Sequence, residues 1–407
     1  MPLRPPAGFI SANYDPLKNP DAPTGVSATG GDASASVSFT APTNVGGSAI
    51  TAYYAVSNPS QVTVSGTSSP INVTGLSNGT SYTFQVWALN SFGPGPFSAA
   101  SGSVTPSTPR GLFAGGQNSS GSGTNVNTIQ YITITTTGNS TYFGDLTTAG
   151  ATTGLASSTR GVFGPIGAPF VAANTINYVT IASTGNASSF GQLSVARAPL
   201  ATCSSSTRGL FAGGDDGSAR SNVIDYITIA SVGNATDFGD LTVARNSAAG
   251  CASPTRGVFA GGAATGGVIG NVIDYVTIAT TGNATDFGDL SQSTQSAGGC
   301  SSSTRGLFAG GYGSSGSPVN VIEYVTIASV GNATDFGDLT QSVLDLAGCS
   351  SATRGVFGGG ATINSFSATT NVIQYVTIAS VGNATDFGDL SSGLWYLGAC
   401  SNSHGGL

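Results

Sequence analysis

An internal repeat constrains the fold of this chain more than any other feature. The string Arg-Gly-(Leu/Val)-Phe occurs six times, at successive intervals of 50, 48, 48, 49 and 49 residues. In each copy a tyrosine in a β-branched run and a phenylalanine in a Gly-Asn-Ala-Thr-Asp-Phe-Gly-Asp-like run follow. Six copies at one period indicate one supersecondary unit built six times, each burying its apolar face against its neighbours. The recurrent residues are Arg110, Arg160, Arg208, Arg256, Arg305 and Arg354, then Tyr131, Tyr178, Tyr226, Tyr275, Tyr324 and Tyr375, then Phe143, Phe190, Phe238, Phe287, Phe336 and Phe387.

Each unit is predicted to contain four short strands. A stretch of small residues, such as residues 298–304, forms the first strand. The Arg-Gly-Leu-Phe-Ala-Gly-Gly segment forms the second, which is apolar on both faces, as expected where neighbouring sheets cover it. The β-branched run around the tyrosine forms the third, and the segment around the phenylalanine forms the fourth. Gly-Asn is expected to make a tight turn between these last two strands, since both residues tolerate positive φ.

The composition favours an all-β fold and excludes several partners. Only 7% of the 407 residues are charged, against about 25% in ordinary proteins, so few residues are available for the polar faces of helices. The net charge is −7, without any Lys/Arg cluster, which argues against nucleic acid and anionic membrane as partners. No apolar run approaches the length of a membrane span, so membrane insertion is not expected.

Counting strands predicts how the repeats close. The first unit, at Arg110, has no small-residue strand before it, and the last such strand, around Cys400, has no Arg-Gly strand after it. Residues Leu397–Ser403 should therefore complete the first unit, which removes an open sheet edge that would invite aggregation.

The repeats resemble kelch repeats. The double glycine after the second strand, the tyrosine in the third and an aromatic residue near the end of the unit carry the resemblance over about 300 residues. Phenylalanine stands where kelch repeats usually have tryptophan, and the recurrent arginine is a further departure. Four-stranded units of this length are the blades of β-propellers. The resemblance implies a six-bladed β-propeller over residues 107–407.

Residues 22–106 resemble a fibronectin type III β-sandwich. Alternation at Ala35–Thr40 and Ile50–Val56 predicts strands, and in a third strand Tyr82 and the alternate residues 84, 86 and 88 should point inward. Leu76 and Tyr82 occupy the places of the tyrosine corner of such domains, while Phe39 replaces the usual tryptophan. Trp87 should point outward and is a candidate contact with the repeats or a neighbouring subunit. Residues 1–21, with five prolines, are expected to form an extended arm.

The order of these segments resembles virion structural proteins of marine tailed phages, cyanophages in particular. The resemblance implies a virion protein in the tail, a fibre or the capsid decoration, held to other virion proteins by its arm and present as a homo-oligomer. The N-terminus lacks the apolar core of a secretory signal peptide. This agrees with synthesis in the host cytoplasm and release by lysis; a cytoplasmic protein is the alternative.

The recurrent polar residues are predicted to be structural rather than catalytic. The carboxylates of the Asp-Phe-Gly-Asp tetrads should accept backbone N–H bonds or pair with the recurrent arginines; a repeated cation site is the alternative. Arg256 and Asp289 are accordingly predicted to be structural residues. The Asn-x-Thr/Ser sequences are interpreted as turn asparagines, with glycosylation as the alternative. The second aspartates are Asp145, Asp240, Asp289, Asp338 and Asp389, and the asparagines are Asn139, Asn186, Asn234, Asn283, Asn332 and Asn383.

No catalytic residue, metal site or cofactor is predicted. The five cysteines occur one per unit rather than in Cys-x-x-Cys pairs, and there is a single histidine, so free buried thiols are expected. Asp-Phe-Gly occurs without the lysine and His-Arg-Asp of a kinase. Paired carboxylates leave a polysaccharide-degrading enzyme as the least favoured class.

The loops that differ between units are the candidate binding surface. In β-propellers the connections after the second and the fourth strands emerge on one face, where ligands usually bind. We expect this face to bind a host-surface glycan or another virion protein, and a purely architectural virion component is the alternative. The candidate residues are Arg197, Asp215, Asp216, Arg245, Tyr312, Asp345, Trp395 and Tyr396.

Overall fold

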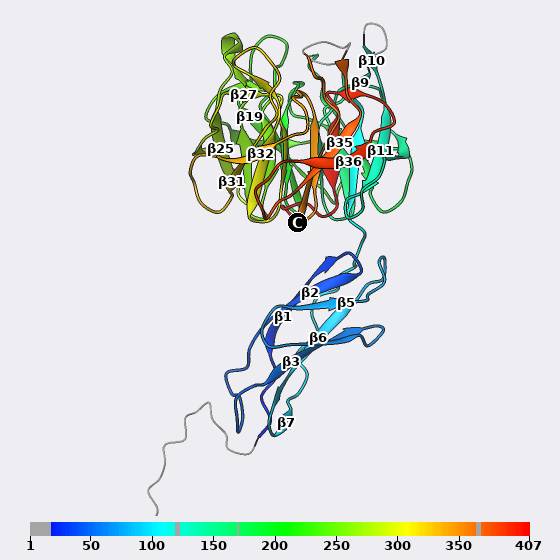
Figure 1. The fold of residues 1–407 in the computed structure, drawn as a ribbon, viewed down its shortest axis with the longest axis vertical. Coiled ribbons are helices and arrows are strands. Elements are labelled where there is room, and N and C mark those ends of the chain that lie inside the picture. The colour runs from blue at the N-terminus through cyan, green and yellow to red at the C-terminus, as the bar shows by residue number, and fades with distance from the viewer. Residues whose placement is uncertain (1–17, 119–122, 169–170, 364–367) are drawn as a thin grey trace, which may run out of the picture. The chain divides into compact units, whose positions relative to one another are not determined.

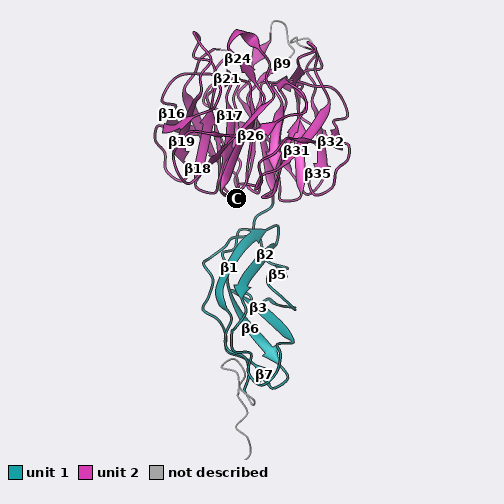
Figure 2. Ribbon diagram, turned by 90° about the vertical axis from the view of Figure 1, so that its left-hand side faces the viewer, with its two compact units in different colours: residues 1–108 teal, residues 109–407 magenta. Residues whose placement is uncertain are grey.

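The chain is all-β and divides into two compact units, residues 1–108 and 109–407 (Figure 2). The computed structural model describes residues 18–118, 123–168, 171–363 and 368–407. Most of the expected N-terminal arm, residues 1–17, lies outside the described residues. The described residues contain one helical turn, the 3-10 helix η1 (Thr265–Gly267), and no α-helix. Within them, no helix reaches the length and apolar character required to cross a membrane.

The first unit is a sandwich of two antiparallel sheets (Figure 1). One sheet has the order β1-β2-β5 and the other β4-β3-β6-β7. The alternation in the sequence predicts which residues face inward, because successive side chains of a strand point to opposite faces. The strands are β1 (Thr24–Gly31), β2 (Ser34–Thr40), β3 (Ala52–Asn58), β4 (Thr63–Gly66), β5 (Ile71–Thr74), β6 (Thr83–Asn90) and β7 (Gly93–Pro94).

Tyr82 ties the start of β6 to the preceding loop, as the tyrosine-corner prediction requires. Its ring is buried in the core beside Phe84, Val86 and Ala88, and its hydroxyl accepts a 3.0 Å hydrogen bond from the backbone N–H of Ser77. The predicted register of β6 is thereby confirmed. Trp87 lies on the opposite face of the strand, half-buried, where it stacks on Tyr54 with ring centroids 4.1 Å apart.

The second unit contains six four-stranded antiparallel sheets, one for each sequence repeat (Figure 1). In five sheets the strands follow chain order from the small-residue strand outward. In the remaining sheet the order is β12-β11-β8-β38, so Gly398–Ser401 completes the sheet that begins at Arg110, as the strand count predicts. The sheets comprise β8 (Arg110–Ala114), β11 (Thr128–Thr133), β12 (Thr141–Asp145) and β38 (Gly398–Ser401); β13 (Gly154–Ala156), β14 (Arg160–Phe163), β15 (Thr175–Thr180) and β16 (Ser188–Gln192); β17 (Ala201–Ser204), β18 (Arg208–Ala212), β19 (Val223–Thr228) and β20 (Thr236–Asp240); β22 (Ala249–Ala252), β23 (Arg256–Ala260), β25 (Val272–Thr277) and β26 (Thr285–Asp289); β28 (Gly298–Ser301), β29 (Arg305–Ala309), β31 (Val321–Thr326) and β32 (Thr334–Asp338); and β33 (Ala347–Ser350), β34 (Arg354–Gly358), β35 (Val372–Thr377) and β36 (Thr385–Asp389).

The small-residue strands contact one another in sequence around the middle of this unit. Each of β13, β17, β22, β28 and β33 touches the next, and β38 contacts both β33 and β13. Small residues are needed here because the strands approach closely: a Cβ on Gly299 would lie 2.3 Å from the carbonyl oxygen of Gly250 on the neighbouring strand. Short accessory strands lie at one end of the unit: β9 (Gln117–Asn118), β10 (Thr124–Asn125) and β37 (Leu394–Trp395) form one sheet, β21 (Arg245–Asn246) pairs with β24 (Ala263–Ala264), and β27 (Thr294–Gln295) pairs with β30 (Tyr312–Gly313).

The Gly-Asn pairs link neighbouring sheets and do not form the predicted turns. The turn between the third and fourth strands lies just before them, as in the bond from Thr136 N–H to the Thr133 carbonyl. The Gly331 N–H donates instead to the Phe287 carbonyl on the outer strand of the preceding sheet, at 2.7 Å. The side-chain oxygen of Asn332 accepts from the Asp289 N–H at 3.1 Å. The same pair of bonds occurs at all six junctions; the side-chain acceptors are Asn139, Asn186, Asn234, Asn283, Asn332 and Asn383.

The recurrent arginines also bridge sheets, but not through the aspartates as expected. Arg256 lies over the ring of Tyr275 at 4.3 Å, and its Nη1 donates to the Ile327 carbonyl of the next unit at 2.8 Å. The Asp289 carboxylate forms no ion pair among the described residues. Of the two kinds of partner predicted for the aspartates, the arginine is therefore not found at Asp289, because the third-strand tyrosine shares the arginine's sheet face and holds the guanidinium against the next unit.

We predict that Gly288→Ala weakens the second unit, because its Cβ would lie 2.6 Å from the carbonyl carbon of Gly331 in the next sheet. Forcing an atom into such a contact typically costs about 1–3 kcal/mol. Gly270→Ala is the matched control, since the nearest atom to its Cβ would be the Gly262 carbonyl oxygen at 3.8 Å. Thermal denaturation measures both variants. Equal melting temperatures would show that the junction does not limit stability.

Candidate functional site

The variable loops lie at the end of the second unit opposite to the C-terminus, where Figure 1 shows β9, β10 and β27. Here the segments that lead from the fourth strand of one sheet to the first strand of the next come together. Their backbones bond in succession: Ser296 N–H donates to the Ser247 carbonyl at 2.8 Å, and Asp345 N–H donates to the Ser296 carbonyl at 2.9 Å. Tyr396 N–H then donates to the Asp345 carbonyl at 3.2 Å. With the bonds from the Ser247 N–H to the Pro199 carbonyl and from the Thr152 N–H to the Tyr396 carbonyl, they join six loops in succession.

Four of these loop residues have left-handed backbones. The φ angles are 52° at Ser247, 59° at Ser296, 52° at Asp345 and 54° at Tyr396. Such a conformation costs of order 1–3 kcal/mol for a non-glycine residue and is found mainly where a site must be shaped. The successive backbone bonds maintain it here.

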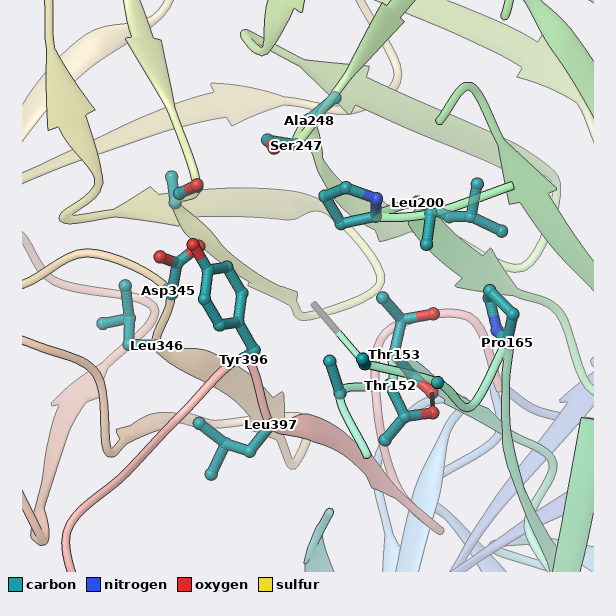
Figure 3. A pocket seen from close by; sticks show the side chains of 17 residues that line it. Thr152, Thr153, Pro165, Leu200, Ser247, Ala248, Asp345, Leu346, Tyr396 and Leu397 are labelled. Atoms are coloured by element: carbon teal, nitrogen blue, oxygen red, sulfur yellow. Dashed lines mark hydrogen bonds between the residues drawn. The ribbon is translucent and has the colours of Figure 1, made fainter. Parts of the chain in front are cut away.

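A pocket of about 670 Å³, including its open mouth, lies among these loops (Figure 3). Asp345 and Tyr396 form one wall, with the carboxyl beside the phenol hydroxyl, and Pro165 and Leu200 lie on the other side. Ser247 and Ser296 add hydroxyl groups to the polar side.

Asp345 is the acidic residue of this pocket and is buried. Burial raises the pKa of Asp345 to about 7, although hydrogen bonds from Ser296 and Tyr396 favour the ionised form. Burial, with Asp345 adding to it, also raises the pKa of Tyr396. The pocket therefore holds an acid that changes charge near neutral pH. Since the lining contains a single carboxylate, it lacks the pair of acids that glycoside cleavage requires.

Three predicted surface residues are instead part of the interior, which corrects the sequence-based assignment. Arg197 is fully buried and pairs with Asp225 at 2.9 Å, and Arg245 pairs with Asp274 at the same distance. Each arginine pairs with a carboxylate on the third strand of the sheet that follows it in the chain, Asp225 on β19 or Asp274 on β25. Trp395 is 3% exposed and packs against Leu344 and Ala361 in a small apolar cluster.

The other candidates lie in the loops. Asp215, half-buried, is paired with Arg220. Asp216 is exposed, and hydrogen bonds from Ser218 and Ala219 lower its pKa to about 2. Tyr312 is half-buried beside the cluster that contains Trp395. The structure brings Asp345 and Tyr396 together and leaves Asp215 and Asp216 in a separate loop.

Sequence reasoning missed the polar residue that precedes each recurrent tyrosine. In two repeats this residue is an aspartate, Asp225 or Asp274, that pairs with a buried arginine. It also accepts hydrogen bonds from the second residue after the fourth strand of the preceding sheet. The Thr242 hydroxyl, for example, donates to the Asp274 carboxylate at 2.5 Å. A polar residue at one fixed position within an otherwise apolar strand was the signal. The six residues are Gln130, Asn177, Asp225, Asp274, Glu323 and Gln374.

The opposite end of the inner strands is covered by the C-terminal segment. His404 Nε2 is 2.8 Å from the Ala156 carbonyl, and His404 Nδ1 accepts from the Gly406 N–H at 3.1 Å. The Gly405 N–H donates to the Ser301 carbonyl at 2.9 Å. Both imidazole nitrogens are therefore used by the neutral ring, with the proton on Nε2.

The cysteines are free and buried, as predicted. Each lies on an inner strand, where its sulfur packs against the next sheets; a Cβ on Gly306 would lie 2.5 Å from Cys251 Sγ. Burial raises the pKa of Cys251 and of Cys349 to about 12, so these thiols stay protonated and unreactive. Among the described residues no group of three His, Cys, Asp or Glu side chains could hold a metal ion. The five free cysteines are Cys203, Cys251, Cys300, Cys349 and Cys400.

Comparison with known proteins identifies the first unit. The family model of the fibronectin type III domain matches residues 21–103. Residues 21–103 thus form a fibronectin type III domain. No curated protein matches the chain in sequence.

His404 should make the second unit sensitive to acid. Burial lowers the pKa of His404 below its ordinary value, so the folded state binds the proton less well than the unfolded chain. The stabilisation is complete above the unfolded pKa, near 6.5, and is lost as the pH falls through the folded pKa. Asp345 acts in the opposite direction, because its raised pKa stabilises the folded state as the pH falls. The comparison is therefore made with His404→Gln, whose amide can donate to Ala156 and accept from Gly406 without binding a proton. Between pH 7 and pH 5 we expect the melting temperature of the unchanged protein to drop relative to that of the variant. Identical pH profiles would exclude this role.

Proposed function

We propose that the chain is a structural and binding protein of a tailed-phage virion, in which residues 107–407 form a six-bladed β-propeller. The propeller would bind a host-surface glycan or another virion protein through its variable loops. Support for the propeller comes from the six four-stranded sheets, the succession of contacts among their inner strands and the pairing of β38 with β8.

The observation that carries the binding function is the difference between the two ends of the second unit. The recurrent arginines and asparagines form the same junction contacts in every unit, as Arg256 and Asn332 illustrate. The loops at the other end differ in sequence and length, and they surround a pocket. A fold that needed only stability would not require six different loops. This contrast favours a binding face over an enzyme centre.

The virion location is supported by the order of the segments. A proline-rich N-terminus, a fibronectin type III domain and Gly/Ser/Thr-rich repeats are the arrangement of the phage proteins that the chain resembles. In this proposal the arm attaches the chain to other virion proteins, and copies of it assemble as a homo-oligomer. Many copies on one particle would strengthen weak individual contacts.

A purely architectural virion component is the second candidate. The burial of Arg197, Arg245 and Trp395 favours it, because three of the eight residues assigned to binding contribute to packing instead. Trp87 has a similar status: its stacking on Tyr54 accounts for its position without a partner.

Closure by the C-terminal strand is tested by truncation. Deleting Leu397–Leu407 removes β38 and leaves an open edge at β8, so we expect aggregation or a large loss of melting temperature. Deleting Asn402–Leu407 is the matched control because it keeps β38 and removes only the segment that covers the inner strands. If the longer truncation melts like the full chain, the closed six-bladed arrangement is refuted.

The virion function is tested by immunogold labelling of particles pelleted from lysed producer cells, with antibodies against residues 109–407. We expect gold on the particles, and no label with pre-immune serum. Full-length protein with residues 312–319 shortened should keep its melting temperature and bind less to host cells. Label confined to cellular debris would contradict a virion protein, and unchanged binding by the shortened loop would favour the architectural candidate.

A further inference from the structure

We propose that the pocket lined by Asp345 and Tyr396 binds a primary ammonium group carried on a small apolar or sugar skeleton. The inference deepens the proposed function, and rests on it for the biological role of the ligand. It names the chemistry that the variable face recognises.

The charge of the lining selects a cation. Asp345 is the only charged residue among those that line the pocket. Its side chain is 8% exposed, its Oδ2 atom has no hydrogen-bond partner, and it forms no ion pair with another described residue. An ionised carboxylate in such a place is costly until an opposite charge compensates it. In its ionised form the carboxylate would repel an anionic ligand.

The hydrogen-bonding groups of the pocket favour a ligand rich in donors. Five of the six loops donate a backbone N–H to the carbonyl of the neighbouring loop. The sixth loop does not, because Pro199 has no N–H to donate to the Thr152 carbonyl. Asp345 adds carboxylate acceptors, and the hydroxyls of Ser247 and Ser296 can accept as well as donate. A primary ammonium group has three donors and no acceptor, which complements this set.

The remaining wall suits an apolar or sugar skeleton. Pro165, Pro199, Leu200, Leu346 and Leu397 line the pocket opposite to or beside the polar groups. The Tyr396 ring adds an aromatic surface, on which a cation or a sugar face can lie. The pocket therefore fits the end of a ligand, such as an amino sugar or a lysine side chain, rather than the interior of a polymer.

Binding of an ammonium ligand should depend on the ionisation of Asp345. Tyr396 faces the carboxyl across the pocket wall and stays neutral, and Tyr312 packs against the same apolar cluster. With the Asp345 pKa at about 7, the ionised fraction rises about tenfold between pH 6 and pH 8. An amine that stays protonated over this range should gain affinity by about the same factor, whereas a neutral alcohol should not.

The test compares cyclohexylamine with cyclohexanol on the full-length protein, by isothermal titration calorimetry and ligand-observed NMR. We expect the amine to bind at pH 8, to bind about tenfold more weakly at pH 6, and to bind more tightly than the alcohol at pH 8. Asp345→Asn should abolish the preference for the amine and its pH dependence. Asp335→Asn, an exposed aspartate of the same repeat on the outer strand β32, should leave both unchanged. Glucosamine and Nα-acetyl-lysine methylamide then distinguish a sugar source from a peptide source of the ammonium.

Equal affinity for cyclohexylamine and cyclohexanol, or amine binding that survives Asp345→Asn, would overturn the ammonium site. So would the absence of binding by both compounds in a variant series that melts normally. The particle-labelling experiment is independent of these titrations. Label on virions without amine binding refutes the pocket chemistry alone, and amine binding without label refutes the virion location alone.

Discussion

The second unit depends on hydrogen bonds between neighbouring sheets. At each junction a Gly-Asn segment donates and accepts main-chain bonds along the outer strand of the preceding sheet, and an arginine held on a tyrosine ring reaches the next unit's isoleucine carbonyl. No single unit can satisfy these groups alone. The junction between the last and first units, where Asn139 accepts from Asp389, is equivalent to the others. The return of the chain at β38 is thus needed to complete a system in which every unit supports two others.

This construction explains why so few charges suffice. Apart from the arginine, the polar groups at each junction are main-chain amides and an asparagine side chain, which need no counter-charge when they are buried and bonded. Charged side chains are buried on three third strands. Asp225 pairs with Arg197 and Asp274 pairs with Arg245, while Glu323 accepts a hydrogen bond from the Ser291 N–H. Breaking such a buried pair typically costs about 3–5 kcal/mol, while replacing both partners can be neutral. In other units an uncharged residue, Gln374 or Asn177, takes the same position. Its side-chain oxygen accepts a hydrogen bond from a backbone N–H just after the fourth strand of the preceding sheet.

The two ends of the inner strands are built differently. At one end His404 and Gly405 satisfy carbonyls of the inner strands. At the other end the chain continues into six different loops, which successive backbone bonds join and four of which contain a left-handed residue. That arrangement places Asp345 and Tyr396 beside each other although they come from different repeats. The loops can therefore vary in sequence while the junctions between sheets stay the same.

Much of the fold was determined by the sequence alone. The 48–50-residue period, the tyrosine corner around Tyr82 and the unpaired strand near Cys400 are local or periodic signals, so they predicted the repeats, the first unit and the pairing of β38 with β8. Only the tertiary structure decided what each recurrent polar residue contacts. The sequence alone leaves several partners open for Arg256 and Asn332. Because neighbouring sheets approach closely, Arg256 donates to a backbone carbonyl and Asn332 accepts from a backbone N–H, and neither hydrogen-bonds to a carboxylate among the described residues. The same holds for Asp345: its neighbours in the pocket are fixed by six loops meeting in space, an arrangement that no single repeat encodes.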